Sequence, residues 1–330
     1  MRVSVEISTF NNAPLVRRVL EHLARQTYPA DLFEVVISDD GSTDRVVDMV
    51  RSLAPELAFA VTLLENEHRG AGHAHNRGIR ACKNDLVVML AADVLATPTL
   101  IEDHVRLQRE HPAPQEVVVG RLLQSPELPG DAIQQGWNRV VNRLFERPKD
   151  DIQHGGFLVS NISFKRDFML RHGMFREWPP VAQEDMELGY RLRQVGMRVI
   201  RSPGALGYHH HEVTLAGLAR RAYMQGYNYH YLEDNVPEAW IRRKTGRVAP
   251  ADGLGPWLAA RLKGALRRAV VNEVTLRGVV YPLLHSAERR ALLRPLVPSL
   301  CGKVTLHHFH AGLRDRARGR EFDLSRVVPG

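Results

Sequence analysis

Acidic side chains stand at three points where the sequence passes from one expected element to the next. FEVVISDD ends on Asp39 and Asp40, and LVVMLAADV carries the lone carboxylate Asp93 between small and apolar neighbours. The pair Glu184 and Asp185 in QEDMELGYRLRQVG opens an amphipathic pattern. A buried carboxylate is costly unless something pairs with it. Carboxylates can hold a divalent cation or accept a proton, so both chemistries are open to these residues.

Each acidic stretch also has a purely structural interpretation. DDGSTD is suited to a surface turn in which Ser42 or Thr43 caps a helix. Asp93 can cap the helix that follows it. Glu184 and Asp185 can stabilise the positive end of a helix macrodipole. The residue types and spacing leave both interpretations open.

Three histidines, His209 to His211, follow the stretch MRVIRSPGALGY, which reads as extended. Alternate side chains of an extended chain share a face, so His209 and His211 point to the same side. One of these imidazoles can bind a metal, or all three can be exposed on a turn. Both interpretations remain open.

The elements that position these residues alternate along the first 120 residues. Four stretches read as strands: 3–7, 33–38, 60–64 and 86–90. We expect Asn12, Ser42 or Thr43, and Thr97 to cap the helices between them. The repeated β-α order predicts an α/β fold with a Rossmann-like, mostly parallel sheet and helices on both faces. Ligands of such sheets bind beyond the carboxyl ends of the strands, where the acids fall.

Beyond residue 115 the pattern is less regular, with one helix expected around residues 133–145. HGGFLVSNISFKR reads as a glycine turn that leads into a strand. QEDMELGYRLRQVG predicts a helix with Glu187 and Arg191 paired on its solvent side. MRVIRSPGALGYHHH predicts two short extended pieces around Pro203. From Val213 onward the pattern is helical.

Composition favours an ordinary globular protein, with 44% hydrophobic and 25% charged residues. No apolar run approaches the roughly 18 residues that span a bilayer, and the start alternates like a strand rather than a signal peptide. The two cysteines, Cys82 and Cys301, give neither a disulfide framework nor a zinc spacing. We therefore expect a cytoplasmic setting.

Positive charge is concentrated in the last third of the chain. From Ile241 to the end there are 18 Lys and Arg against 6 Asp and Glu, whereas the first 240 residues hold 27 against 31. This asymmetry indicates an anionic partner such as a membrane surface, a nucleic acid or a polyanionic substrate. PWLAARLKGALRRAVV is a basic amphipathic pattern around Trp257 that can lie on an anionic membrane. It can equally pack on the rest of the protein with its basic face in water.

Together these stretches resemble the inverting glycosyltransferases of family 2, which have the nucleotide-sugar-binding GT-A fold. The resemblance runs from Val3 to about His211 through VSVEISTFNN, FEVVISDDGSTD, NEHRGAGHAHNRGI, VVMLAADV, GGFLVSNISFKR, HGMF and QEDMELGYRLRQVG. It implies a GT-A catalytic domain over 1–212, followed by a basic, mainly helical extension over 213–330. The implied donor is a nucleotide-diphospho-sugar, and the implied cofactor is Mn²⁺ or Mg²⁺.

The resemblance also implies roles for individual residues. Ser8, Phe10 and Asp40 would contact the nucleoside, with Asp40 accepting from a uracil-type N3–H, which favours a UDP-type donor. Residues near the diphosphate would be Arg69, His73, His75 and Asn76. Asp93 and His209 would bind the metal, and Ala91 departs from the family because it stands where a further acid is usual. Asp185 would be the general base, with Glu184 orienting the loop, and Trp178 would stack on an acceptor sugar or simply pack.

Alternative functions remain at this point. A nucleotidyltransferase would need a glycine-rich basic loop after the first strand, and STFNNAP has none. A nucleotide-sugar-binding protein without catalysis is suggested by Ala91 but disfavoured by Asp93 and Asp185. A nucleic-acid partner is not expected, because no known binding motif accompanies the basic segment. The acceptor is left open among a lipid-linked saccharide, a polysaccharide end and a small molecule, and the location extends to the inner face of the cell membrane.

Overall fold

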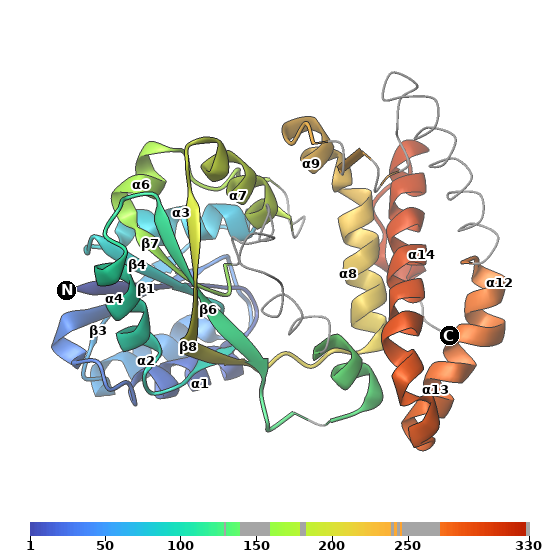
Figure 1. Cartoon of the computed structure of the whole chain (residues 1–330), viewed down its shortest axis with the longest axis horizontal. Coiled ribbons are helices and arrows are strands. Elements are labelled where there is room, and N and C mark those ends of the chain that lie inside the picture. The colour runs from blue at the N-terminus through green and yellow to red at the C-terminus, as the bar shows by residue number, and fades with distance from the viewer. Residues whose placement is uncertain are drawn as a thin grey trace. The chain divides into compact units, whose positions relative to one another are not determined.

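The computed structural model describes residues 1–128, 130–138, 159–178, 183–238, 241–242, 245 and 271–327 (Figure 1). The chain forms two compact units. The first comprises Met1–Leu128, Val141–Pro180 and Glu184–His211, and the second comprises Pro129–Val140, Val181–Gln183 and Glu212–Gly330.

An eight-stranded sheet in the order β3-β2-β1-β4-β7-β6-β8-β5 forms the centre of the first unit. Its strands are β1 (Val3–Thr9), β2 (Phe33–Asp39), β3 (Ala60–Glu65), β4 (Leu86–Leu90), β5 (Val94–Ala96), β6 (Glu116–Gln124), β7 (Asn161–Lys165) and β8 (Arg198–His209). Strands β3, β2, β1 and β4 are parallel, as are β6 and β8, whereas β7 and β5 pair antiparallel. The expected α/β architecture is confirmed, with its parallel part in the strands that carry the acids.

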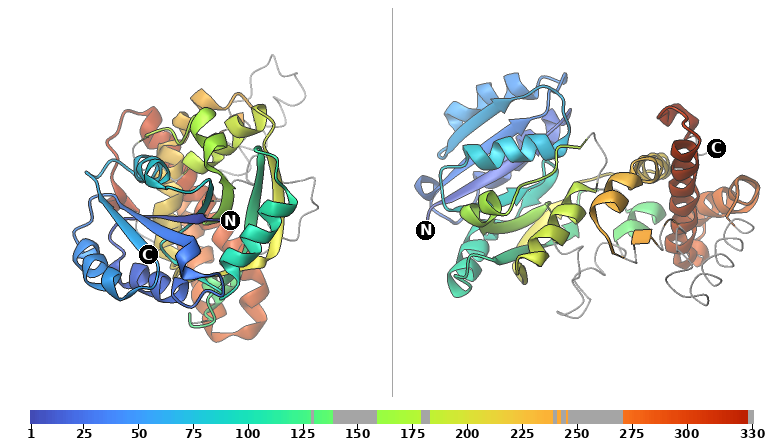
Figure 2. Two further views of the ribbon diagram at one scale, coloured as in Figure 1. Left: turned by 90° about the vertical axis from the view of Figure 1, so that its left-hand side faces the viewer. Right: turned by 90° about the horizontal axis from the view of Figure 1, so that it is seen from above.

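Apolar side chains cover both faces of this sheet. One core packs Val3, Val5 and Ile7 of β1 against three helices. These are α1 (Ala13–Leu23), α2 (Val46–Leu53) and α4 (Leu100–Glu110). The other packs β2, β4 and β7 against α3 (Ala71–Ala81), α6 (Arg166–Arg171) and α7 (Glu184–Gln194). Figure 2 (left) shows the blue helices and the cyan and yellow-green helices on opposite sides of the strands. Two short 3-10 turns, η1 (Ala30–Leu32) and η2 (Ala54–Glu56), complete the connections.

Helices α1 and α2 share a single capping carboxylate, Asp44. Its Oδ2 accepts from the backbone N–H of Ala13 at 2.7 Å, and its Oδ1 accepts from that of Val46 at 3.3 Å. Asn12 precedes α1 as expected, but its side chain makes no capping bond. The expectation that Ser42 or Thr43 caps α2 is wrong, because α2 begins later and both residues belong to the turn before it. Side chains can cap across loops, which local sequence does not reveal.

Two further expectations are corrected where strands pair. Thr97 does not cap α4, which begins at Leu100. Instead its hydroxyl donates to the carbonyl of Leu206 in β8 at 2.7 Å. The two extended pieces expected around Pro203 are one strand, β8, which contains a bulge because Ser202 pairs with Gly120 and Leu206 with Arg121. A bulge accommodates proline because it interrupts the ladder of hydrogen bonds.

Asn161 in β7 fastens this bulge. Its Nδ2 donates to the carbonyls of Ala205 at 2.9 Å and Arg121 at 3.2 Å, and its Oδ1 accepts from Nε2 of His104 at 2.8 Å. Gly120 is required beside it, because a Cβ there would lie 2.3 Å from Asn161 Nδ2. The bulge sets the course of β8 toward His209.

The second unit is helical where it is described. Its elements are α8 (Leu215–Tyr227), α9 (Tyr229–Asn235), α12 (Glu273–Thr275), a π-helical turn (Leu276–Val280), α13 (Tyr281–Arg289), η6 (Ala291–Leu296), α14 (Val297–Ala317) and η7 (Leu324–Arg326). Helices α8 and α14 approach closely at Gly226, where a Cβ would lie 1.9 Å from the carbonyl of Phe309. The helix expected at 133–145 is described only to residue 138, and the basic helix around Trp257 lies outside the described residues. Within the described part of the chain, no helix has both the length and the apolar character to cross a membrane.

Candidate active site

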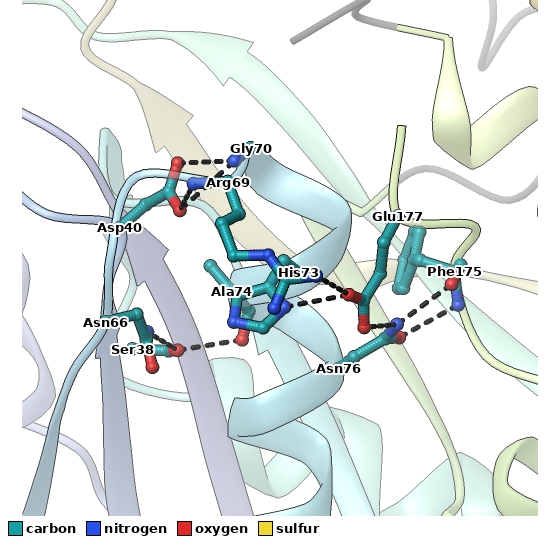
Figure 3. Close-up of polar contacts among 10 residues, drawn as sticks. All are labelled: Ser38, Asp40, Asn66, Arg69, Gly70, His73, Ala74, Asn76, Phe175 and Glu177. Atoms are coloured by element: carbon teal, nitrogen blue, oxygen red, sulfur yellow. Dashed lines mark hydrogen bonds and ion pairs between the residues drawn. The ribbon is translucent and has the colours of Figure 1, made fainter. Parts of the chain in front are cut away.

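Asp40 lies at the carboxyl end of β2 and organises the loop before α3 (Figure 3). Its Oδ1 accepts from the backbone N–H of Arg69 at 3.0 Å and its Oδ2 from that of Gly70 at 2.9 Å. Nδ1 of His68 lies 2.8 Å from the same Oδ2. Gly70 has a φ of 98°, a left-handed conformation that favours glycine at this tight entry to α3. Asp40 is buried, and its hydrogen bonds hold the loop that contains Arg69 and Gly70 in place.

Phe10 and His68 form an exposed stack beside Asp40. Their ring centroids are 4.2 Å apart with an interplanar angle of 17°, and Phe10 keeps 45% of its surface exposed. A large exposed aromatic side chain held by a flat neighbour is suited to stack on another ring. Ser8, by contrast, is half-buried and donates its hydroxyl hydrogen to Oε1 of Glu6 at 2.7 Å.

His75 forms a buried pair with Glu6 of β1. Nδ1 of His75 lies 3.0 Å from Oε2 of Glu6, whose side chain is fully buried, and the imidazole stacks on Phe175. Burial alone would lower the pKa of His75, but the carboxylate of Glu6, aided by the charges of Glu184 and Asp185, outweighs it and raises the pKa. The folded protein therefore favours the imidazolium form of His75 more than free solution does.

Asn76 clamps the segment that follows α6. Its Nδ2 donates to the carbonyl of Phe175 at 2.8 Å, and its Oδ1 accepts from the N–H of Phe175 at 2.9 Å. Arg69, His73 and Asn76 also converge on the carboxylate of Glu177, as Figure 3 shows. The loop and the first turns of α3 are thus joined to the segment that carries Trp178. The indole of Trp178 is half-buried, and its backbone N–H donates to the carbonyl of Arg176 at 3.0 Å.

Asp93, His209 and His211 converge at the edge of the sheet. Oδ2 of Asp93 lies 3.2 Å from Nε2 of His209 and 3.5 Å from Nδ1 of His211. Pairing of β5 with β8 places Val94 opposite His209 and so brings the two segments together. Burial would raise the pKa of Asp93, but hydrogen bonds from both imidazoles outweigh it and hold the pKa well below its usual range.

These three side chains fit a divalent cation. One ligand atom from each lies within 4.8 Å of the others, and all three side chains retain access to solvent. His210 points away from this cluster, since its Nδ1 lies 2.9 Å from the hydroxyl of Ser125 and its ring contacts Arg18. The sequence expectation named Asp93 and His209, and the structure adds His211.

Glu184 and Asp185 form the first turn of α7, half-buried. Oδ1 of Asp185 accepts from the backbone N–H of Met186 at 2.8 Å. The charges of both acids contribute to raising the pKa of His75, which pairs with Glu6 of β1.

Glu187 is not on the solvent side of α7, as expected, but fully buried. It pairs with Arg191 at 2.6 Å and with Arg176 at 2.9 Å. Arg191 in turn donates to the carbonyls of Gly173 and Met174. The i,i+4 spacing predicted the pair of Glu187 and Arg191 correctly, but the prediction that it lies on the solvent side of α7 was wrong. The segment that contains Gly173 and Met174 folds over this face, and Arg191 donates hydrogen bonds to its carbonyls.

Sequence reasoning missed three residues that shape this site, namely Glu6, His68 and Glu177, and it gave His211 no separate role. A signal existed for His211, because alternate residues of an extended piece share a face. Glu6 also gave a signal, since an acid in the middle of an apolar strand needs a partner. His68 and Glu177 stand in irregular segments, and no spacing rule marks them.

A family described as glycosyl transferase family 2 matches residues 4–171, just over half of the chain. The chain belongs to this family. The resemblance to family 2 glycosyltransferases noted in the sequence is thereby confirmed.

Relatives with known names are glycosyltransferases. The validoxylamine A glucosyltransferase of Streptomyces hygroscopicus subsp. jinggangensis is 31% identical over 246 residues, which cover 66% of this chain and 58% of that protein. A protein of the same name from Streptomyces hygroscopicus subsp. limoneus is 30% identical, with 54% of it covered. The chain thus spans a little over half the length of these relatives.

Solved structures share the GT-A fold at low identity. A mannosyltransferase from Pyrobaculum calidifontis in complex with GDP-Man and Mn²⁺ gives a TM-score of 0.61 at 22% identity, covering 97% of this chain and 88% of that one. TarS of S. aureus, residues 1–349, in complex with UDP-GlcNAc gives 0.52 at 16% identity, covering 98% and 93%. These likenesses support the fold that the sequence predicts.

Proposed function

We propose that the protein transfers a sugar from a nucleotide-diphospho-sugar to an acceptor hydroxyl, with inversion at the anomeric carbon. The convergence of Asp93, His209 and His211 beside the carboxyl ends of the strands carries this proposal. A ligand at that edge sits where open α/β sheets bind nucleotides. Membership of a glycosyltransferase family supports the reaction class.

The proposed cofactor is a divalent metal held by these three residues. Carboxylate ligands suit Mg²⁺ and Mn²⁺, whereas imidazole suits transition metals, so the mixed set favours Mn²⁺ over Mg²⁺. When bound, the metal would neutralise charge on the diphosphate leaving group. The solved mannosyltransferase of the same fold contains Mn²⁺.

We assign the donor side to the loop between Arg69 and Asn76 and to the Phe10–His68 stack. A carboxylate offers about four acceptor positions, so Asp40 can hold the loop and still accept from a uracil-type N3–H. The proposed donor is accordingly of UDP type. Ser8 acts on this side indirectly, through Glu6 and His75.

Asp185 is the proposed general base, with Glu184 as a positioning neighbour. Its carboxylate would take the proton of the acceptor hydroxyl while that oxygen bonds to the anomeric carbon and the carbon–diphosphate bond breaks on the opposite face. One such displacement inverts the configuration. Trp178 is the proposed stacking surface for the acceptor. The proposed acceptor is a lipid-linked saccharide, the end of a polysaccharide or a small molecule.

Nucleotide binding under metal titration tests this proposal. We expect UDP, among UDP, GDP, dTDP and CMP, to raise the melting temperature most strongly in Mn²⁺, and UDP-sugars to be hydrolysed slowly. Substitution of Asp93, His209 or His211 by alanine should remove the part of this rise in melting temperature that depends on Mn²⁺. His210→Ala is the control, because that side chain faces Ser125. Unchanged Mn²⁺ dependence in all three variants would contradict the assignment.

A further inference from the structure

Glu177 has an unusual number of partners for a residue of an irregular segment. Its Oε2 lies 2.9 Å from Nδ1 of His73 and 3.2 Å from Nη2 of Arg69, and its Oε1 accepts from Nδ2 of Asn76 at 3.2 Å (Figure 3). All three partners lie in the loop before α3 or in its first two turns. Hydrogen bonds from His73 and then Asn76, together with the charges of His73 and Arg69, lower the pKa of Glu177, so it is an anion at neutral pH.

The groups that hold Glu177 are groups that would bind a phosphate. Arg69 is a half-exposed guanidinium, which forms charge-assisted bonds to carboxylate and phosphate alike. His73 can donate from its ring. Asp40 fixes the backbone of this loop and so fixes where both side chains begin.

We propose that Glu177 is a positioning residue. In the free protein its carboxylate pairs with Arg69 and His73, and the diphosphate of the donor displaces it and pairs with the same two side chains. This rests on the proposed donor. Once a nucleotide diphosphate pairs with Arg69 and His73, Glu177 loses two of its three partners. Glu177 is then released from these groups, and the surroundings of the adjacent Trp178 change with it.

The rest of the segment stays anchored when Glu177 leaves. Asn76 holds both backbone groups of Phe175, and Arg176 pairs with the buried carboxylate of Glu187. Glu177 is the first residue beyond these anchors. Its ion pairs are partly exposed, and such pairs are worth little, so an incoming diphosphate can displace them.

Glu177→Gln tests the exchange. The amide keeps the size of the side chain and can still accept from Asn76, but it no longer competes as an anion. Calorimetric titration with UDP in Mn²⁺, and with inorganic pyrophosphate, should show roughly two- to fivefold tighter binding than wild type, the range expected for an exposed ion pair. Glu67→Gln removes an exposed acid two residues before Arg69 and is the matched control, with affinity unchanged.

Fluorescence of Trp178 separates release from simple charge removal. UDP should change the emission of the wild type, the change should be lost in Trp178→Phe, and free Glu177→Gln should already show the shifted emission. Equal or weaker binding in Glu177→Gln, or an emission change that Trp178→Phe retains, would overturn the inference. A wild type that binds neither UDP nor GDP would instead overturn the proposed function, and this inference with it.

Discussion

At the scale of single residues, the proposed role of Asp185 as general base leads to a direct test. Asp185→Asn keeps the shape of the side chain but removes the proton acceptor. Because base catalysis contributes about 10²–10⁴-fold, kcat should fall by roughly that factor while donor affinity stays nearly unchanged. Turnover with an acceptor and donor titration measure the two quantities. Glu184→Gln should cost less, and near wild-type turnover in Asp185→Asn would reduce Asp185 to a helix-terminal acid.

The pair of Glu6 and His75 predicts a pH dependence of stability. The pKa of His75 is raised above its ordinary value of 6.5, so the folded state favours the imidazolium. The stability it contributes is fully present below 6.5 and is lost as pH rises through the raised pKa. We expect the free energy of unfolding in urea to fall over this window in the wild type and to change less in Glu6→Gln.

Glu34→Gln is the control for that experiment. Glu34 is a buried glutamate on the neighbouring strand β2 and accepts from Ser4, as Glu6 accepts from Ser8. It has no histidine among its described hydrogen-bond partners. A pH profile that Glu34→Gln flattens as much as Glu6→Gln would show that His75 is not the titrating group.

Residue types in sequence reveal part of the site and not its contacts. Asp93 and His209 could be singled out as candidates because an acid after an apolar strand and histidines in an extended stretch are both unusual, and the structure brings the two side chains together. Glu177 could not be singled out, because its partners come from a loop a hundred residues earlier in the chain and are brought to it only by tertiary folding. The role of Asp40 as the organiser of that loop was likewise hidden, since a backbone N–H has no sequence signature.

The anchor between α7 and the preceding segment belongs to the scale of elements. Glu187 is fully buried between Arg176 and Arg191. Removing one partner of a buried ion pair costs about 3–5 kcal/mol, so Glu187→Ala should lower the free energy of unfolding by roughly that amount. Asp167→Ala is the control, because it breaks an i,i+4 pair with Arg171 that is exposed on α6. An equal loss of unfolding free energy in the two variants would show that Glu187 does not anchor the segment before α7.

His104 links α4 to β7 and predicts sensitivity to acid. Its Nε2 lies 2.8 Å from the acceptor Oδ1 of Asn161 and its Nδ1 lies 2.9 Å from the hydroxyl of Ser163, which can donate, so the two contacts suit a neutral ring. Burial first of all lowers its pKa from 6.5 to about 4. The folded state therefore keeps it neutral, and stability present above 6.5 should be lost as pH falls toward 4, by up to about 3 kcal/mol.

Unfolding in urea at pH 7 and pH 5 measures this effect. His104→Gln should lower stability at pH 7 but show a smaller decline toward pH 5 than the wild type. His172→Gln, which changes an exposed histidine of the same unit, should decline as the wild type does. An unaltered decline in His104→Gln would assign the acid sensitivity to other groups.

Element positions followed from the sequence better than element ends did. Alternating and apolar runs located β1 to β4 because strand formation depends on burial of nearby residues. The start of α2 was misplaced because its cap, Asp44, also serves α1. The continuity of β8 through Pro203 was missed because a bulge is defined by the partner strand β6.

Charge distribution belongs to the scale of the whole molecule. We propose that the basic stretch of residues 257–271 docks on an anionic membrane, with each basic residue near the surface contributing at most about 1 kcal/mol. The full chain should co-sediment with vesicles that contain phosphatidylserine and not with phosphatidylcholine vesicles. Binding to the anionic vesicles should decrease as salt is raised. Equal binding to both kinds of vesicle, or none, would exclude electrostatic docking.

The three residues that converge at the edge of the sheet come from distant parts of the chain. Asp93 follows β4, whereas His209 and His211 stand at the end of β8, the last strand of the first unit. A chain still on the ribosome cannot assemble this triad until β8 has emerged and paired with β5. A cation held there would be acquired late in synthesis, and its uptake would report that the sheet is complete.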